Sequence, residues 1–184
     1  MQKKLRIGTV KKQDILENQA KKVYLGIGSN LGNRIKNIDK AKYLIRSFNI
    51  KILKSSSYYK TESWPNKSFP YYINVVILIS THLDLIQLYK KIKFIEKKIG
   101  RVKMPRNYPR VCDIDIIDFN GIVNSINYKN NKIVTPHERM HKRNFVLLPL
   151  NEINKSWEHP KYKKNIVNLL SKLPILDLRS INLI

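Results

Sequence analysis

The 184-residue sequence contains a single cysteine, Cys112, so no disulfide can form within the chain. Small secreted domains are usually cross-linked by several disulfides, and their absence favours a reducing compartment. No apolar run approaches the roughly 20 residues that a membrane-spanning helix needs. The basic N-terminus also lacks the apolar stretch and cleavage site of a secretory signal. We therefore expect a cytoplasmic protein without a membrane partner.

Acidic residues are scarce, since 13 Asp and Glu stand against 36 Lys and Arg, for a formal net charge of +23. A nucleic-acid partner or a polyanionic small substrate would explain the charge. Lys, Ile and Asn are all abundant, however, and their codons are A/T-rich, so we attribute most lysines to genomic composition. Only nine basic residues are arginines, and five of them lie between positions 101 and 143. Because guanidinium groups bind phosphate oxygens in pairs, this cluster indicates a specific anion site.

Hydrophobic residues make up 42% of the chain and aromatic residues 9%, which is typical of a globular protein. The length suits one domain with a full core. We expect residues 1–21 to form a polar extension outside the core, and residues 22–184 to form a single domain.

Hydrophobic periodicity predicts the order of the secondary-structure elements. Strands are expected at 22–27, 50–59, 71–80 and 113–119. Helices are expected after Asn33, a plausible N-cap, and at 83–99, where Gly100 ends the helix. A hairpin within 121–134 and short helices at 144–153 and 163–173 would follow. This β-α-β-β-α-β order matches an α+β, ferredoxin-like split βαβ core, an antiparallel sheet with helices packed on it, with C-terminal additions. RNA-binding modules share this topology, so a basic nucleic-acid-binding module stays open.

The sharpest local signal is the pair Asp113 and Asp115. In a strand these side chains share one face, roughly 6.6–7 Å apart along the chain, whereas Asp118 should point the other way. Two carboxylates on one face repel each other unless a cation lies between them, and Mg²⁺ favours a few carboxylates with phosphate and water. A solvent-facing polar strand edge is the alternative.

A basic loop directly precedes this pair and strengthens the metal interpretation. It supplies four cations within twelve residues of the carboxylates: Arg101, Lys103, Arg106 and Arg110. Cations that hold phosphate oxygens beside bridging Mg²⁺ are what phosphoryl-type transfer requires, because its catalysis is mostly positioning and charge neutralisation.

Three further patterns carry weaker signals. The glycine-rich stretch 26–32 lies between a strand and a helix but lacks the spacing and lysine of a phosphate loop, so we interpret it as a structural turn. His137 could bind phosphate beside Arg143. A flat heterocycle could be bound by Tyr72, Asn74 and Phe145, although the sequence pattern alone favours core packing for both aromatic rings. No spaced His/Cys set supports a zinc site.

Taken in order, these segments resemble the 6-hydroxymethyl-7,8-dihydropterin pyrophosphokinase family. The resemblance covers about 130 residues, or about 70% of the chain. The matching segments are VYLGIGSNLGNR, SSSYYKTESW, YYINVVI, FIEKKIGR, PRVCDIDIIDF and TPHERMHKRNFVLLPL. No single segment is decisive, but the ordered set is highly specific.

The resemblance implies a role for each site residue. Two Mg²⁺ ions would be bound by Asp113 and Asp115, which with Arg101 and Arg110 form the catalytic set. ATP would be held by Glu96, Lys103, Arg110, His137 and Arg143. The pterin would be stacked between Tyr72 and Phe145, read by Asn74 and lined by Thr61 and Trp64. The enzyme, acting as a monomer, would transfer diphosphate from ATP to the pterin and release AMP, in folate synthesis.

Some positions depart from the family's pattern. The loop has Asn107 where tryptophan is frequent and Tyr108 where a small residue is frequent, and Val111 replaces a common threonine. Glu62 also stands where proline is common. These differences concern the loops more than the metal site, and they keep open a third interpretation, an inactive relative.

Overall fold

The computed structural model describes residues 19–105 and 107–184, so most of the predicted N-terminal extension and Arg106 of the basic loop lie outside the described residues. The elements, in order, are β1 (Lys21–Ser29), α2 (Arg34–Ser47), β2 (Lys51–Ser55), β3 (Tyr59–Thr61), β4 (Tyr72–Thr81), α3 (Leu85–Ile99), β5 (Asp113–Phe119), β6 (Asn124–Tyr128), β7 (Asn131–Thr135), a 3₁₀ turn η1 (Met140–Lys142), α4 (Asn144–Ile153), α5 (Ile166–Leu170), α6 (Ile175–Arg179) and β8 (Ile181–Leu183).

The main sheet is antiparallel, in the order β5-β1-β4-β3-β8, and β2 also pairs with β4. The predicted α+β class is therefore confirmed. The hairpin β6-β7 forms a second, two-stranded sheet, as predicted.

Two predictions of element boundaries were wrong. The expected strand at 50–59 is split into β2 and β3, because the side chain of Ser56 bonds Val76 N (3.0 Å) and Ser57 N donates to Glu152 of α4 (2.9 Å). The last predicted helix covers only 166–170, and α6 and β8 were not expected. Their short, weakly periodic sequences are ordered by tertiary contacts, since β8 pairs with β3.

The helix ends follow local chemistry. The Asn33 side chain caps α2 by accepting from Lys36 N, as the sequence predicts. Asp84 and Gln87 form a reciprocal capping box at the start of α3. Gly100 ends α3 with φ of 113°, in the left-handed region that glycine adopts without a Cβ clash.

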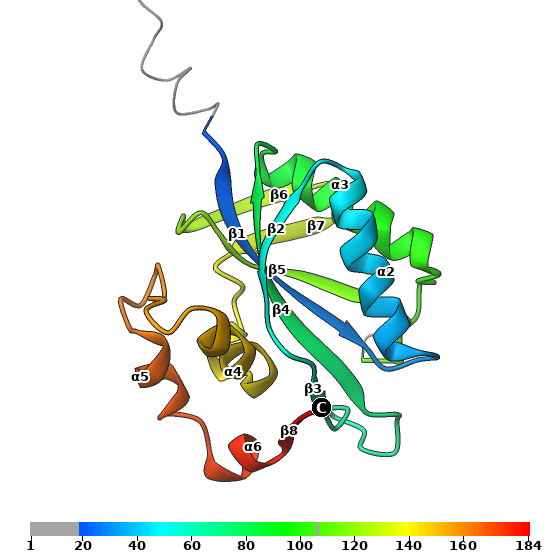
Figure 1. The fold of residues 1–184 in the computed structure, drawn as a ribbon, viewed down its shortest axis with the longest axis vertical. Coiled ribbons are helices and arrows are strands. Elements are labelled where there is room, and N and C mark those ends of the chain that lie inside the picture. The colour runs from blue at the N-terminus through cyan, green and yellow to red at the C-terminus, as the bar shows by residue number, and fades with distance from the viewer. Residues whose placement is uncertain (1–18, 106) are drawn as a thin grey trace, which may run out of the picture.

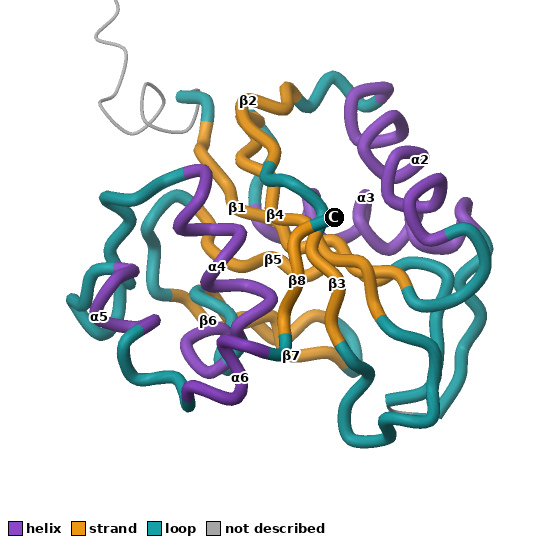
Figure 2. The backbone as a smooth tube through the Cα atoms, turned by 60° about the horizontal axis from the view of Figure 1, so that its bottom comes forward, coloured by secondary structure: helices purple, strands orange, loops and turns teal. Residues whose placement is uncertain are grey.

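Two hydrophobic cores lie on opposite faces of the main sheet. One contains Ile73, Val75, Ile77 and Ile79 of β4 together with the apolar faces of α2 and α3. The other contains Val76 and Leu78, the alternate residues of β4, with the helices α4 and α5. Figure 1 shows α2 and α3 on one side of the sheet and α4 on the other, and Figure 2 shows the same separation from a second direction.

Strand β5 contains a bulge that overturns the prediction for Asp118. The register with β1 shifts between Tyr24/Asp118 and Leu25/Ile116, so one extra residue, Ile117, interrupts the alternation. Asp118 consequently points to the α4 side, where it accepts hydrogen bonds from Trp157 Nε1 (2.9 Å) and Gly121 N (2.9 Å). Burial raises the pKa of this carboxyl.

We expect Trp157→Phe to lower the free energy of unfolding by about 2–3 kcal/mol, because it leaves a buried carboxylate oxygen without its donor. The matched control is Trp64→Phe, since Trp64 is 75% exposed and its replacement should change stability by less than about 0.5 kcal/mol. Urea denaturation followed by circular dichroism measures both. Equal stability of the two variants would show that the Asp118–Trp157 bond contributes nothing.

Candidate active site

Strand β1, which lies between β4 and β5, carries no side chain at two positions on the α4 face of the sheet. Gly28 of β1 lies opposite Asn74 of β4 and Asp113 of β5, and Gly26 lies opposite Asp115. A Cβ on Gly28 would come within 2.9 Å of Asn74 Oδ1. We call this surface the glycine floor (Gly26 and Gly28). The interpretation of both glycines as turn residues was wrong: they lie within β1, and only Gly32 of this stretch has a positive φ (65°).

Asp113 lies on one side of the glycine floor and is held by two arginines. Arg101 Nη1 donates to its Oδ1 (2.5 Å), and Arg110 Nη1 donates to its Oδ2 (2.9 Å). Burial alone would raise the pKa of Asp113, but the two guanidinium charges outweigh it and hold the pKa below its usual value. Asp113 is therefore a carboxylate at neutral pH.

Asp115 shares that face, as the alternation of β5 predicts, and its side chain is 38% exposed. Arg143 Nη1 donates to its Oδ2 (3.3 Å), and His137 Nε2 lies 3.8 Å from the same oxygen. His137 Nδ1 accepts from Arg139 N (3.1 Å), so the proton of the neutral ring sits on Nε2, toward Asp115. Burial lowers the pKa of His137 despite the nearby carboxylate, so the ring is neutral at pH 7.

Glu96 supports this cluster from beneath. Its side chain is 3% exposed, and burial raises its pKa. Its Oε1 accepts from Ile114 N (2.8 Å) and from Arg101, while Oε2 accepts from Lys93 Nζ (2.9 Å). The carboxylate thus joins the end of α3 to the start of β5 and orients Arg101 toward Asp113.

Across the glycine floor, β3 and β4 present a second group. Asn74 is buried and donates from Nδ2 to Thr61 Oγ1 (2.9 Å). Tyr72, next to Asn74 on the same face, pairs with Thr61 in the β3–β4 register. Phe145 at the start of α4 lies beneath Arg143, whose Cζ is 5.4 Å from the ring centroid. Asn74 and Thr61 therefore lie across β1 from the carboxylates, whereas the Tyr72 ring reaches over Gly28 and Phe145 lies beside Arg143.

Two predicted site residues do not join these contacts. Trp64 is 75% exposed in the loop after β3, and Lys103 is exposed in the loop after α3. Arg106 lies outside the described residues. Sequence reasoning missed Asn30, a buried amide whose bonds reach both loops. Its only sequence signal is a polar residue at the end of a buried strand.

The residues present suit a magnesium-dependent polyphosphate site. Among the described residues no group of three or more His, Cys, Asp or Glu side chains could hold a metal. Mg²⁺ typically binds through one or two carboxylates with water and substrate phosphates, however, so the pair Asp113 and Asp115 is a sufficient donor set.

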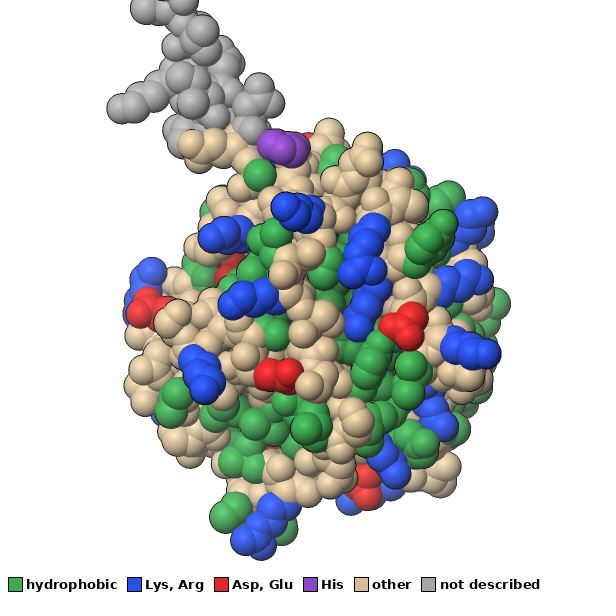
Figure 3. Space-filling view, in the orientation of Figure 1, with side chains coloured by type: hydrophobic (Ala, Val, Ile, Leu, Met, Phe, Trp, Pro, Cys, Tyr) green, Lys and Arg blue, Asp and Glu red, His purple; other side chains and the backbone are tan. Residues whose placement is uncertain are grey.

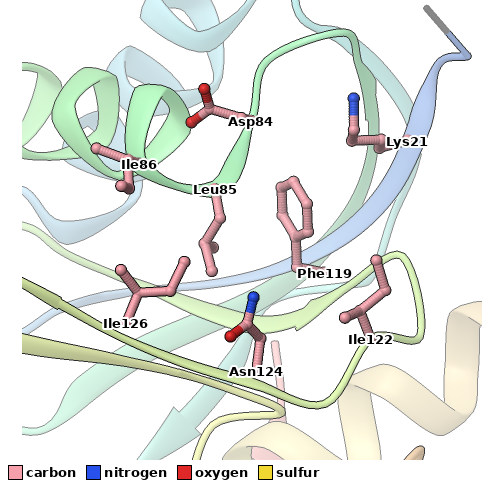
Figure 4. A pocket seen from close by; sticks show the side chains of 8 residues that line it. All are labelled: Lys21, Asp84, Leu85, Ile86, Phe119, Ile122, Asn124 and Ile126. Carbon is pink, nitrogen blue, oxygen red and sulfur yellow. The ribbon is translucent and has the colours of Figure 1, made fainter. Parts of the chain in front are cut away.

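A hollow in the described structure lies away from this site. It measures about 250 Å³ and is lined by Leu85, Phe119, Ile122 and Ile126 with the polar residues Lys21, Asp84 and Asn124. Figure 4 shows this pocket beside the start of α3. Leu85 and Phe119 belong to the α2–α3 core, on the other face of the sheet from Asp113, and Asp84 is occupied in capping α3. The pocket is therefore separate from the carboxylate cluster.

Basic side chains are spread over the face in Figure 3, rather than collected into a single stripe. This distribution fits lysines that decorate the surface for compositional reasons. Within the described residues, no helix has the length and apolar character to cross a membrane.

Comparison with known proteins first defines the class. The HPPK-DHPS protein of Plasmodium falciparum has a crystal structure that matches 84% of this chain, and 45% of its own, with a TM-score of 0.69 at 15% identity. This likeness establishes the α+β fold. A family model described as 7,8-dihydro-6-hydroxymethylpterin-pyrophosphokinase (HPPK) matches residues 24–155. The chain belongs to this family.

Two similar proteins differ in how much of their own length the match to this chain covers. The chain is 36% identical over 142 residues to the 2-amino-4-hydroxy-6-hydroxymethyldihydropteridine pyrophosphokinase of Aquifex aeolicus, covering 77% of this chain and 86% of that protein. It is 35% identical over 173 residues to the folic acid synthesis protein fol1 of Pneumocystis carinii, covering 94% of this chain. It spans only 22% of the fol1 length.

We expect Glu96→Gln to destabilise the protein by about 2–4 kcal/mol, because the amide places a donor against Arg101 or Lys93 and leaves Ile114 N or the cations unsatisfied. Thermal and urea unfolding at pH 7 measure the change. Glu62→Gln is the matched control, since its ion pair with Lys67 joins two exposed side chains and its loss should leave stability almost unchanged. A Glu96→Gln variant as stable as the control would contradict the supporting role.

Proposed function

We propose that this protein transfers diphosphate from Mg-ATP to 6-hydroxymethyl-7,8-dihydropterin and releases AMP, in folate synthesis. Family membership supports the reaction class. The observation that carries the proposal is the arrangement across the glycine floor: the carboxylates of Asp113 and Asp115 with their arginines on one side, and Tyr72 and Asn74 on the other. One side suits a metal-bound polyphosphate and the other a flat polar ring.

At the phosphate side, Asp113 and Asp115 would hold two Mg²⁺ ions. When bound, the metal neutralises phosphate charge and aligns the groups that react. Arg101 and Arg110 hold Asp113 in this structure, and Arg143 lies near Asp115. With Asp113 and Asp115 engaged in holding the metal, these guanidinium groups would be free to bind phosphate oxygens in pairs. Lys103 and neutral His137, a donor through Nε2, would contribute further phosphate contacts.

We assign Glu96 a positioning role rather than direct contact with the nucleotide. Its carboxylate oxygens already bond Ile114, Arg101 and Lys93 within the protein. It acts on ATP through Arg101, whose guanidinium it orients.

At the pterin side, the rings of Tyr72 and Phe145 would stack on the heterocycle. Asn74 would read its hydrogen-bonding edge, held in orientation by its bond to Thr61. The exposed Trp64 would cover the pocket from the loop. Gly28 leaves room on the sheet for the side chains of Asn74 and Tyr72, since a Cβ there would come within 2.9 Å of Asn74 Oδ1 and 3.5 Å of Tyr72 Cδ1.

The reaction would proceed by in-line attack of the pterin hydroxymethyl oxygen on the β-phosphorus. A new oxygen–phosphorus bond forms, the bond from the β-phosphorus to the bridging oxygen breaks, and AMP leaves with that oxygen and its electron pair. The hydroxymethyl proton is lost to solvent, so no residue is assigned as a general base. The chain's contribution is position and charge, which is how phosphoryl-type transfer is mainly catalysed.

The sheet order β5-β1-β4-β2 supports a ferredoxin-like core. An RNA-binding role is disfavoured, because the sequence has no RGF-x-F-like motif of the kind that RNA-binding modules of this topology carry. The monomeric state, the cytoplasmic location and the separate N-terminal extension stay predictions.

We expect Asp115→Asn to reduce pterin-dependent AMP release by roughly 10²-fold or more, because the amide keeps the shape but loses the charge that holds the metal. Chromatographic measurement of AMP, with and without Mg²⁺, tests this. Asp177→Asn in α6 is the control and should retain wild-type activity. Undiminished activity in Asp115→Asn would contradict the metal site, and no AMP from folded wild-type protein would contradict the proposed function.

We expect Gly28→Ala to weaken pterin binding at least about tenfold, since the added methyl group displaces Asn74 Oδ1. Mg-ATP binding should be almost unchanged, because the methyl group faces Asn74 rather than the carboxylates. Gly26→Ala is the control, since its Cβ would meet Ile117 Cδ1 at 3.3 Å instead. Calorimetric titration with each ligand measures both affinities. Equal loss of pterin affinity in the two variants would argue against a specific clash with Asn74.

A further inference from the structure

Asn30 bonds the segment that carries Arg110. This residue directly follows β1 and is 1% exposed. Its Oδ1 accepts from Arg110 N (2.7 Å), and its own backbone N donates to Arg110 O (3.2 Å). Asn30 thus bonds both the backbone N–H and the backbone carbonyl of Arg110. Arg110 lies three residues before Asp113, and its side chain donates to that carboxylate.

The other end of the same amide holds the loop between β3 and β4. Asn30 Nδ2 donates to Ser63 Oγ (3.1 Å) and to Pro70 O (3.2 Å). Ser63 Oγ in turn donates to Pro70 O (2.6 Å). These bonds close the loop 62–70 at its two ends, next to Thr61 and Tyr72.

The chemistry of the amide explains why asparagine is required. Its oxygen faces an N–H donor of one segment, and its nitrogen faces the acceptors of the other segment. An aspartate could keep the bond to Arg110 N, but it would place a carboxylate oxygen against Pro70 O. Because Asn30 is buried, water does not readily replace a lost partner.

A second contact joins the same two segments directly. The rings of Phe69 and Tyr108 lie 5.7 Å apart between centroids, tilted by 48°. Both contacts therefore connect loop 62–70, on the pterin side, with residues 107–110, on the phosphate side.

We propose that Asn30 is a positioning residue that couples these two segments, so that ordering one by its ligand orders the other. On this proposal Asn30 is the residue that carries the dependence of pterin affinity on bound Mg-ATP, and by linkage the reverse dependence with the same factor. The ligand identities rest on the proposed function, whereas the coupling of the segments does not.

Hydrogen exchange of the ligand-free full chain, followed by mass spectrometry, tests the coupling without activity. We expect Asn30→Ala to accelerate exchange about tenfold or more in peptides covering both 62–70 and 107–112. Asn30→Asp should accelerate only 62–70, because its bond to Arg110 N remains. Asn37→Ala is the matched control: its amide bonds Ser29 Oγ and Leu31 O within the same turn but contacts neither loop. Acceleration of only one segment in Asn30→Ala, or of neither, overturns the proposal.

Binding measurements then test the consequence for the ligands. Calorimetry gives the affinity for a non-hydrolysable ATP analogue with Mg²⁺, with and without 6-hydroxymethylpterin. We expect an enhancement of about 5- to 150-fold in the wild type, retained in Asn37→Ala and close to 1 in Asn30→Ala and Asn30→Asp. A wild-type enhancement that persists in both Asn30 variants overturns the ligand coupling. Failure of the wild type to bind either ligand contradicts the proposed function instead, while the exchange result still decides the role of Asn30.

Discussion

The site depends on Gly26 and Gly28, two glycines of β1, the strand that lies between β4 and β5. Every other strand position on that face carries a side chain, and farther along the same face the side chains of Tyr24, Val76 and Ile117 pack beneath α4. Where β1 carries Gly26 and Gly28 instead, the strand presents no side chain of its own, and side chains of β4 and β5 reach over it. Asn74 and the Tyr72 ring lie against Gly28, and Ile117 lies against Gly26. A side chain at Gly28 would therefore displace Asn74.

Charge balance in the free protein stabilises the two carboxylates. Asp113 and Asp115 lie on one face of β5, where like charges repel each other. Arg101 and Arg110 pair with Asp113, and Arg143 pairs with Asp115, which offsets that repulsion. In the proposed function the same arginines would bind phosphate oxygens, so one set of side chains would serve both arrangements. Glu96 completes the balance from inside the protein, where its desolvation is compensated by three donors.

Predictions from the sequence were correct where they depended on neighbouring residues, and wrong where they depended on contacts with distant residues. The period-2 alternation of 113–119 correctly placed Asp113 and Asp115 together, because that pattern is a property of the strand itself. The same rule failed for Asp118, because a bulge opposite β1 reverses the alternation after Ile116. Caps at Asn33 and Gly100 were predictable from neighbouring residues, whereas the break at Ser56 depends on Val76 and Glu152, distant in sequence.

By itself the sequence determined the class of the elements, the carboxylate pair, the arginine cluster and the family, since these are encoded in local order and spacing. Only the tertiary structure decided which residues lie next to these groups and which hydrogen bonds they make. It set Gly28 between Asn74 and Asp113, made Glu96 an internal support, and gave Asn30 partners in two loops that are 33 to 80 residues away. The physical reason is that a buried polar group must find its hydrogen-bond partners wherever the folded chain brings them, and sequence spacing carries no record of that.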